Sequence, residues 1–284
     1  MLEHNSLEHR GCQFSFKVRG AGPPVLFIQG VATRGDGWQP QVDGLADRYR
    51  CLSFDNRGMG RSQPTGLPLT IEQMTEDARV LMDGQGWESA HVVGHSMGGL
   101  IAQHLALTER RRIRSLSLLC TFARGRDVTR LTPWLLWAGL RMSIGTKKMR
   151  RRGFLRVVMP RDALQHADQD VMAERLAGLF GHDLAEQPPI VKQQLAALKV
   201  YDSTPRLGEL AGIPTLVVSA RHDRIAPPRA GQILARGIPG AHYIELSDAS
   251  HGAPIQIASR INTLLMEHFK RADGEIDRNF PSPG

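Results

Sequence analysis

Apolar and polar residues follow two alternating patterns along most of this chain. Short continuous apolar runs, typical of strands buried on both faces, occur at 25–28, 49–54, 91–94, 113–119, 215–219 and 241–246. Apolar residues at helical spacing occupy the segments that follow or separate these runs, at 42–48, 71–81, 97–109, 229–235 and 255–269. Strands that alternate with helices in this way predict an α/β fold with a parallel, doubly wound sheet.

Two segments depart from this alternation. Residues 7–19 alternate apolar and polar side chains around Arg10-Gly11, as a hairpin at a sheet edge would. Residues 121–207 contain no buried-strand run, and they are rich in arginine and large apolar residues at helical spacing. The sequence therefore predicts a core domain, a helical insertion and, from its Gly, Asn, Pro and Ser content, a disordered tail, with bounds 1–120 and 208–272, 121–207, and 273–284.

The motif Gly94-His95-Ser96-Met97-Gly98 stands where a strand pattern turns directly into a helix pattern. Such a turn strains its central residue and brings the residues two before and two after too close to carry a Cβ, so both are glycine. The strain exposes the Ser96 hydroxyl, and the Met97 N–H and the helix start point to one place. The motif alone also fits an ordinary glycine-rich turn, but its strand and helix context favours a nucleophile.

A serine nucleophile needs a base and an acid that orients the base. His251 follows the last predicted strand, and Asp223 follows the strand before it. The carboxyl ends of neighbouring parallel strands open onto one crevice, so we expect Ser96, His251 and Asp223 to meet there.

Other residues compete for these roles. Asp248 lies three positions before His251, where a turn-forming role is more usual. His95 and His222 adjoin catalytic positions, and their side chains should point away from the crevice. Asp223 as a plain turn residue and His251 as a loop histidine remain the simpler alternatives.

The loop after the first core strand, Gln29-Gly30-Val31, is the second informative segment. An oxyanion hole needs another backbone N–H beside that of Met97, and this loop supplies it in such folds. Val31 is the predicted donor, because Gly30 lets the backbone approach closely.

Composition narrows the functional classes. The chain has 284 residues, 41% hydrophobic and 23% charged, as expected for one large α/β domain or two small ones. No apolar run is long enough to span a bilayer and the N-terminus lacks a signal pattern, so a cytoplasmic protein is expected. Cys12, Cys51 and Cys120 are scattered and form no C-x-x-C pair, which predicts buried thiols and no metal site.

The net charge of +8 could indicate an acidic partner such as nucleic acid or a membrane surface. Much of it lies in two runs, 110–112 and 147–152. Cations are common at helix ends, and a basic run without interleaved aromatic residues is usually a solvated face. We therefore expect no nucleic acid and no membrane partner.

Taken together, these blocks resemble the α/β-hydrolase superfamily from about Phe14 to Phe269, apart from the insertion. The resemblance is carried by 25–30 with Trp38, by 54–62, by 94–99, and by Asp223 with His251. It implies an eight-stranded, mostly parallel sheet with a helical cap inserted after the sixth strand, and the order Ser, Asp, His along the chain. Gln29 departs from the histidine of many members; it can form hydrogen bonds but cannot titrate.

Within the superfamily, the chain looks most similar to small-molecule esterases, enol-lactonases and C–C hydrolases. Haloalkane dehalogenases use an aspartate nucleophile, whereas this motif has Ser96. The expected activity is hydrolysis of a carboxylic ester, thioester or lactone, without a cofactor, through Ser96, His251 and Asp223. Hydrolysis of a diketone C–C bond, or ligand binding without catalysis, are the alternatives, and a homo-oligomer stays open.

A predicted helix in the insertion suggests how substrate is held. Thr132 can cap this helix and Pro133 can start it. Its apolar residues lie nearly all round, so they either pack the insertion on the core or roof the Ser96 crevice. The second interpretation predicts a small to medium apolar substrate and a binding site made of Trp134, Trp137, Phe154, Phe180, Gln29 and Gly30.

Overall fold

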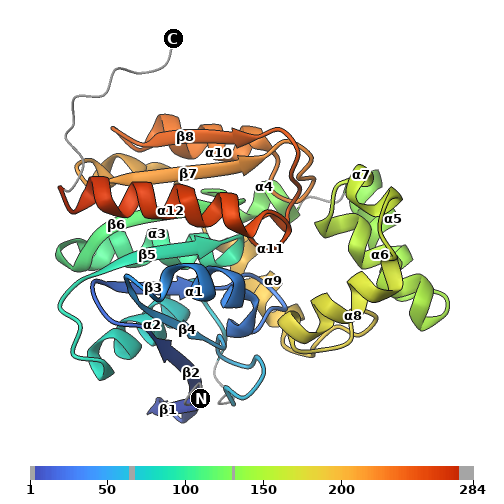
Figure 1. Cartoon of the computed structure of the whole chain (residues 1–284), viewed down its shortest axis with the longest axis horizontal. Coiled ribbons are helices and arrows are strands. Elements are labelled where there is room, and N and C mark those ends of the chain that lie inside the picture. Colours follow the sequence, from blue (N-terminus) through green and yellow to red (C-terminus); the bar gives the residue numbers. More distant parts are fainter. Residues whose placement is uncertain (1–3, 64–67, 130–131, 275–284) are drawn as a thin grey trace.

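The computed structural model describes residues 4–63, 68–129 and 132–274. Its strands form one eight-stranded sheet in the order β1-β2-β4-β3-β5-β6-β7-β8 (Figure 1). β1 and β2 are antiparallel to their neighbours and the other six strands run parallel, which confirms the predicted sheet. The strands are β1 His4–His9, β2 Cys12–Arg19, β3 Pro24–Ile28, β4 Arg50–Phe54, β5 Ala90–His95, β6 Ile113–Leu119, β7 Thr215–Ala220 and β8 His242–Leu246.

The helices connect these strands. The α-helices are α1 Gln39–Leu45, α2 Ile71–Gly84, α3 Met97–Thr108, α4 Gly125–Thr129, α5 Pro133–Ser143, α6 Lys147–Val158, α7 Arg161–Gln165, α8 Gln169–Phe180, α9 Val191–Val200, α10 Pro228–Gly237, α11 Ala253–Gln256 and α12 Ala258–Ala272. Short 3₁₀ helices lie at Gly35–Trp38, Arg110–Arg112 and Thr204–Leu210.

The central strands are apolar on both faces because helices cover both faces. In β3, Val25 and Phe27 belong to the layer with α1 and α12, whereas Leu26 and Ile28 belong to the layer with α2 and α3. All four side chains are fully buried. This two-sided burial explains why the strands read as continuous apolar runs rather than as alternating ones.

Two predicted helices differ most from the structure. The helix predicted at 42–48 runs from Gln39 to Leu45, with Pro40 in its first turn, a position that suits proline. The polar Gln41 of this turn is buried and donates a hydrogen bond to the Pro254 carbonyl. The helix predicted at 255–269 is two helices, α11 and α12, separated at Ile257, where φ is −126° and ψ is 48°. The side chain of Gln256 there bonds to the backbone of Asp248 and Ser250, which ties the short helix to the loop before it.

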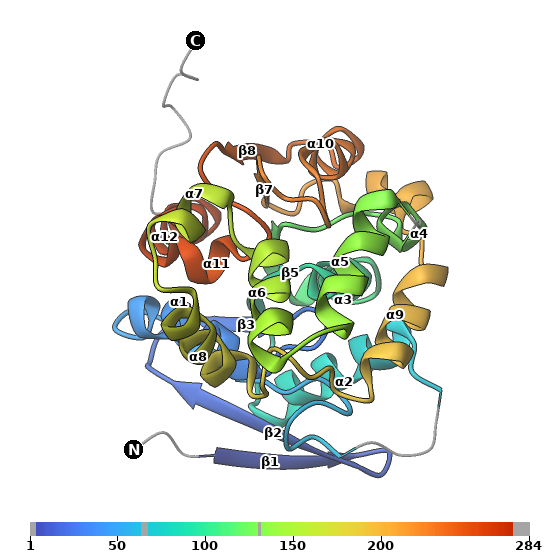
Figure 2. The same ribbon diagram turned by 90° about the vertical axis from the view of Figure 1, so that its right-hand side faces the viewer.

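The insertion between β6 and β7 has two parts. No strand occurs between 121 and 207 in the described part of this segment, and six helices, α4 to α9, occupy it. Residues of α5, α6 and α8 form an apolar cluster of their own, whereas α9 packs on the main core through Leu198. Figures 1 and 2 show α5 to α8 beside the sheet, with α5 and α6 in front of β3 and β5. These helices therefore stand over the carboxyl ends of the strands.

The C-terminal end of the described chain is packed rather than free at Asp273, the first residue of the predicted tail. Its carboxylate accepts a hydrogen bond from Arg114 at 2.8 Å and lies 3.3 Å from His91 Nε2. Burial nevertheless lowers the pKa of His91 to about 4. Residues 275–284 of the predicted tail lie outside the described residues.

Two expectations from composition can be compared with the structure. Cys12, Cys51 and Cys120 are buried free thiols, as predicted. Across the described ranges, no helix is both long and apolar enough to cross a membrane.

Candidate active site

Ser96 occupies the sharp turn between β5 and α3. Its backbone lies at φ 54° and ψ −122°, a strained region for a residue with a side chain. A Cβ on Gly94 would lie 2.4 Å from the Gly98 carbonyl oxygen, and a Cβ on Gly98 would lie 2.1 Å from that of Ile28. The turn therefore tolerates only glycine at both positions, as the motif's spacing predicts.

Ser96, His251 and Asp223 form one continuous line of hydrogen bonds. His251 Nε2 lies 3.1 Å from Ser96 Oγ, and His251 Nδ1 lies 2.7 Å from Asp223 Oδ2. The three residues are only 6%, 6% and 3% exposed, respectively. They follow β5, β8 and β7, three parallel strands of the same half of the sheet, whose carboxyl ends bring them to one place.

The surroundings of Asp223 fix the protonation pattern of His251. The second carboxylate oxygen, Oδ1, accepts the N–H groups of Ile225 and Ala226, each at 2.8 Å. A carboxylate can only accept, so His251 Nδ1 carries the ring proton and Nε2 presents a lone pair to Ser96. This arrangement suits a general base that removes the Ser96 proton.

The competing residues make other contacts, although His95 lines the same cavity as Ser96 and His251, contrary to the expectation that its side chain points away from the crevice. Asp248 is exposed and pairs with Arg260 at 2.9 Å. His95 Nε2 lies 2.9 Å from the His251 carbonyl oxygen, and its ring packs 4.9 Å from that of His251. Burial, followed by the neighbouring His251, lowers the pKa of His95 to about 3, so its ring is neutral and supports the His251 loop. His222 is exposed.

The Gln29-Gly30-Val31 loop lies against Ser96. A Cβ on Gly30 would lie 2.9 Å from Ser96 Cβ. Gln29 is 3% exposed and its Oε1 accepts the Gly30 N–H at 3.1 Å. Within the described residues, the N–H groups of Val31 and Met97 have no hydrogen-bond acceptor. They are therefore available as donors in the two segments that adjoin Ser96.

The insertion holds this loop in place, which the sequence did not indicate. Ala32 adopts a positive φ of 61°, and its N–H donates to Gln194 Oε1 at 3.0 Å. His182 Nε2 lies 2.8 Å from the Ala32 carbonyl oxygen. No local pattern marks Gln194 or His182, because each contact joins segments more than 100 residues apart.

Ser96 and His251 open into a cavity of about 590 Å³. Of the predicted binding residues, Gln29, Gly30, Trp134, Phe154 and Phe180 line it. Phe154 and Phe180 pack edge to face with ring centroids 5.2 Å apart. Further apolar residues that sequence reasoning missed complete the wall, among them Phe122, Leu135, Ala138, Met142, Val191, Leu195, Leu198 and Ile225.

Trp137 does not line this cavity, so its predicted place was wrong. The residues of α5 that do are Trp134, Leu135, Ala138, Gly139 and Met142. These positions share one face of the helix, and Trp137 lies well off its centre at about 100° per residue. Its ring is 39% exposed and lies under the Arg141 guanidinium, 5.8 Å from the ring centroid.

No metal centre accompanies this site in the part of the chain that the structure describes, where no group of three His, Cys, Asp or Glu side chains could hold an ion. The chemistry available here is that of a hydroxyl, an imidazole, a carboxylate and backbone N–H groups.

Comparison with known proteins places these features in a family. The model of the alpha/beta hydrolase fold matches residues 23–256. A relative from Azorhizobium caulinodans, provisionally named carbamate hydrolase RutD, is 28% identical over 93% of this chain and 96% of its own length.

Two solved structures are also similar. The enol-lactonase from Burkholderia xenovorans LB400 is 28% identical, with a TM-score of 0.78, over 94% of this chain and 100% of that chain. A thermophilic esterase from Thermogutta terrifontis is 26% identical, with a TM-score of 0.75, over 95% of this chain and 97% of that chain.

Proposed function

The chain belongs to the alpha/beta hydrolase family, and from this premise we propose that it is a serine hydrolase of carboxylic esters, thioesters or lactones. One observation carries the proposal: the buried hydrogen-bonded line from Ser96 through His251 to Asp223 opens into an apolar cavity. We also propose that α5 to α8 act as the cap of this site.

In the first step, Ser96 Oγ attacks the carbonyl carbon while His251 Nε2 takes the hydroxyl proton. Asp223 stabilises the imidazolium that forms, because its carboxylate stays ionised beside Nδ1–H. The N–H groups of Val31 and Met97 donate to the negative oxygen of the tetrahedral intermediate. His251 then gives the proton to the leaving oxygen or sulfur, the bond to the leaving group breaks, and an acyl-Ser96 ester remains.

In the second step, water replaces the leaving group. His251 Nε2 removes a proton from the water as its oxygen attacks the acyl carbon, and the same N–H groups stabilise the second intermediate. Return of the proton to Ser96 Oγ releases the carboxylic acid and restores the enzyme. The overall reaction consumes one water and needs no other reactant.

The cavity supports a small to medium apolar acyl group. Its volume of about 590 Å³ lies within the usual range for small-molecule sites, and Trp134, Phe154 and Phe180 contribute aromatic surface. The enol-lactonase and esterase similarities support an ester or lactone carbonyl. The Azorhizobium relative favours a second candidate, a carbamate, whose carbonyl would meet the same three side chains.

The test is a turnover panel with p-nitrophenyl acetate, butyrate, hexanoate and decanoate, an aryl carbamate, and a vinylogous diketone. Ester hydrolysis with an optimum at an intermediate chain length is expected, and Ser96→Ala should abolish it without unfolding the chain. Cleavage of the carbamate or the diketone in preference to every ester would replace the proposed bond. Ester hydrolysis by Ser96→Ala near the wild-type rate would refute the role of Ser96.

A further inference from the structure

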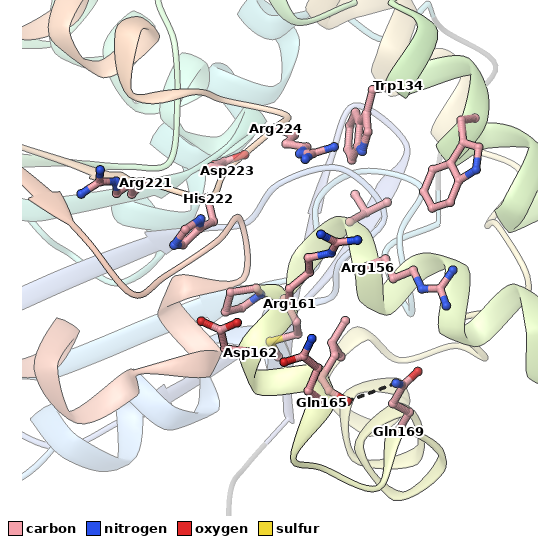
Figure 3. Close-up of a pocket in the computed structure, with 15 residues that line it drawn as sticks. Trp134, Arg156, Arg161, Asp162, Gln165, Gln169, Arg221, His222, Asp223 and Arg224 are labelled. Carbon is pink, nitrogen blue, oxygen red and sulfur yellow. Dashed lines mark hydrogen bonds between the residues drawn. The ribbon is translucent and has the colours of Figure 1, made fainter.

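A second cavity, of about 990 Å³, shares Trp134 with the Ser96 cavity (Figure 3). One wall is the loop Arg221–Arg224 after β7, and the other is formed by the end of α6 with α7. Figure 3 shows Arg224 of the first wall beside Trp134 of α5, and Arg161 on the opposite wall. We call this cavity the arginine groove; its charged lining residues are Arg156, Arg161, Asp162, Arg221, Asp223 and Arg224.

The arginines of this groove have no ionic partners. In the described parts of the chain, no carboxylate forms an ion pair with Arg156, Arg161, Arg221 or Arg224. The conspicuous basic run of α6 is different, since most of its members are neutralised, by the pairs Lys147–Glu186, Lys148–Asp170, Arg151–Asp183 and Arg152–Asp170. Four of the five basic residues of that run are therefore paired, whereas the four arginines of the groove have no ion pair among the described residues.

The two acids of the groove do not balance the four arginines. Asp223 is occupied by His251 and by the N–H groups of Ile225 and Ala226. Asp162 is the remaining carboxylate among the lining residues, and it is exposed. The four arginine side chains are exposed along the groove and so are accessible to a bound anion. Their planar donor pairs match phosphate and carboxylate oxygens.

The arginine groove adjoins the active-site cavity. Trp134 and Val157 line both cavities, so the two cavities meet at these side chains. The Arg224 guanidinium lies 5.6 Å from the centre of the Trp134 ring, and Trp137 lines the groove as well. The exposed indole of Trp137 thus has a place in this groove that it lacks in the Ser96 cavity.

We propose that the arginine groove binds the phosphate-bearing alcohol or thiol portion of the substrate, while the acyl portion lies in the Ser96 cavity. The inference rests on the proposed function, because it assigns the two sides of the cleaved bond to two cavities. A volume of about 990 Å³ suits several phosphate groups with a planar ring, which Trp134 or Trp137 can stack against, better than a single carboxylate.

Two thioesters with the same acyl group test the proposal. Butyryl-coenzyme A carries phosphates and an adenine ring on its thiol, and butyryl-N-acetylcysteamine has the same thioester without them. The wild-type kcat/KM should be at least tenfold higher for the coenzyme A thioester at low salt, and the advantage should shrink as salt rises. In Arg156→Gln/Arg161→Gln the ratio of the two kcat/KM values should fall about tenfold or more, mainly through KM.

The matched control is Arg229→Gln, an exposed arginine on α10 that does not line the groove. It should leave the ratio of the two kcat/KM values unchanged. Equal kcat/KM values for the two thioesters in wild type, with p-nitrophenyl esters still hydrolysed, would overturn the groove and spare the proposed function. If Arg229→Gln lowered the ratio of the two kcat/KM values equally, the effect would come from net charge alone, and this result would also overturn the proposed role of the groove.

Calorimetric binding of coenzyme A to Ser96→Ala separates the two proposals further. Binding is expected, with a dissociation constant raised at least tenfold by adding Arg156→Gln/Arg161→Gln. If that binding were seen while no ester or thioester were hydrolysed by wild type, the groove would stand as a phosphate site and the hydrolase proposal would fail. No binding would overturn the groove.

Discussion

Replacing Asp223 with asparagine exchanges one oxygen for an amide nitrogen and should reverse the hydrogen bonding of His251. In the structure, Oδ1 accepts the N–H groups of Ile225 and Ala226, and Oδ2 faces His251 Nδ1. An asparagine keeps both backbone bonds only if its oxygen stays at the Oδ1 position. Its NH₂ group then donates to Nδ1, the ring proton moves to Nε2, and Nε2 can no longer accept the Ser96 proton.

The alternative amide orientation keeps the His251 proton on Nδ1, but it breaks the hydrogen bonds to the backbone. It would place NH₂ against two backbone donors at 2.8 Å, and each buried donor left without an acceptor costs about 1–3 kcal/mol. The competent orientation therefore lies about 2–6 kcal/mol higher, a population loss of roughly 30-fold to more than 10⁴-fold. The imidazolium also loses its carboxylate partner, so we expect kcat to fall about 10⁴-fold, as for this change in another serine triad.

The assay is steady-state hydrolysis of p-nitrophenyl butyrate, with KM expected to stay within about threefold and Tm nearly unchanged, since the hydrogen bonds are retained in number. Asp248→Asn is the matched control, because Asp248 is exposed and pairs only with Arg260 among the described residues. A loss in kcat below tenfold for Asp223→Asn, or an equal loss in the control, would refute the reasoning.

Three further predictions follow from the same geometry. Trp134→Ala should raise the KM for hexanoate esters roughly tenfold relative to the KM for acetate esters, because about 60 Å² of apolar contact would be lost. Trp137→Ala should leave this ratio of KM values unchanged, and equal effects of the two substitutions would contradict the place of Trp134 in the cavity wall. Asp77→Ala should lower the free energy of unfolding by about 3–5 kcal/mol in urea titrations, because it strands the buried Arg57 guanidinium; a loss below 1 kcal/mol would contradict this. Burial lowers the pKa of His268 from about 6.5 to about 4, so the folded state binds fewer protons than the unfolded state between these pH values. The free energy of unfolding therefore falls by roughly 3 kcal/mol as the pH is lowered from 6.5 toward 4. His268→Gln should flatten the stability profile over that window, and an unchanged slope would show that other groups cause it.

The sequence predicts those parts of the site that depend on local geometry. The strained turn at Ser96 requires glycine at positions 94 and 98, so five consecutive residues are enough to predict it. Asp223 and His251 follow strand patterns that end on the same edge of the sheet, which places them near Ser96 without knowledge of contacts. The order of strands and helices could also be predicted from the sequence, because strands buried on both faces appear as continuous apolar runs.

Features that depend on distant contacts were not predictable. Gln41 looks like a surface residue, yet it is buried and donates a hydrogen bond to the Pro254 carbonyl, 213 positions along the chain. Trp134 and Trp137 are equivalent in composition, and only the rotation of α5 on its neighbours decides which one faces Ser96. The arginine groove is lined by α6, α7 and the loop after β7, so its arginines are far apart in the sequence. The basic run 147–152 is conspicuous in the sequence, but most of its side chains form ion pairs with carboxylates.

Covalent labelling tests the central claim, that Ser96 is an activated nucleophile, most directly. A fluorophosphonate probe is incubated with wild type, Ser96→Ala and Asp223→Asn, and the adduct is located by peptide mass spectrometry. One adduct per chain is expected on Ser96 in wild type and none in Ser96→Ala, and labelling of Asp223→Asn should be much slower. Rapid labelling of Ser96→Ala at another residue, or no labelling of wild type under conditions in which it is folded, would contradict the account.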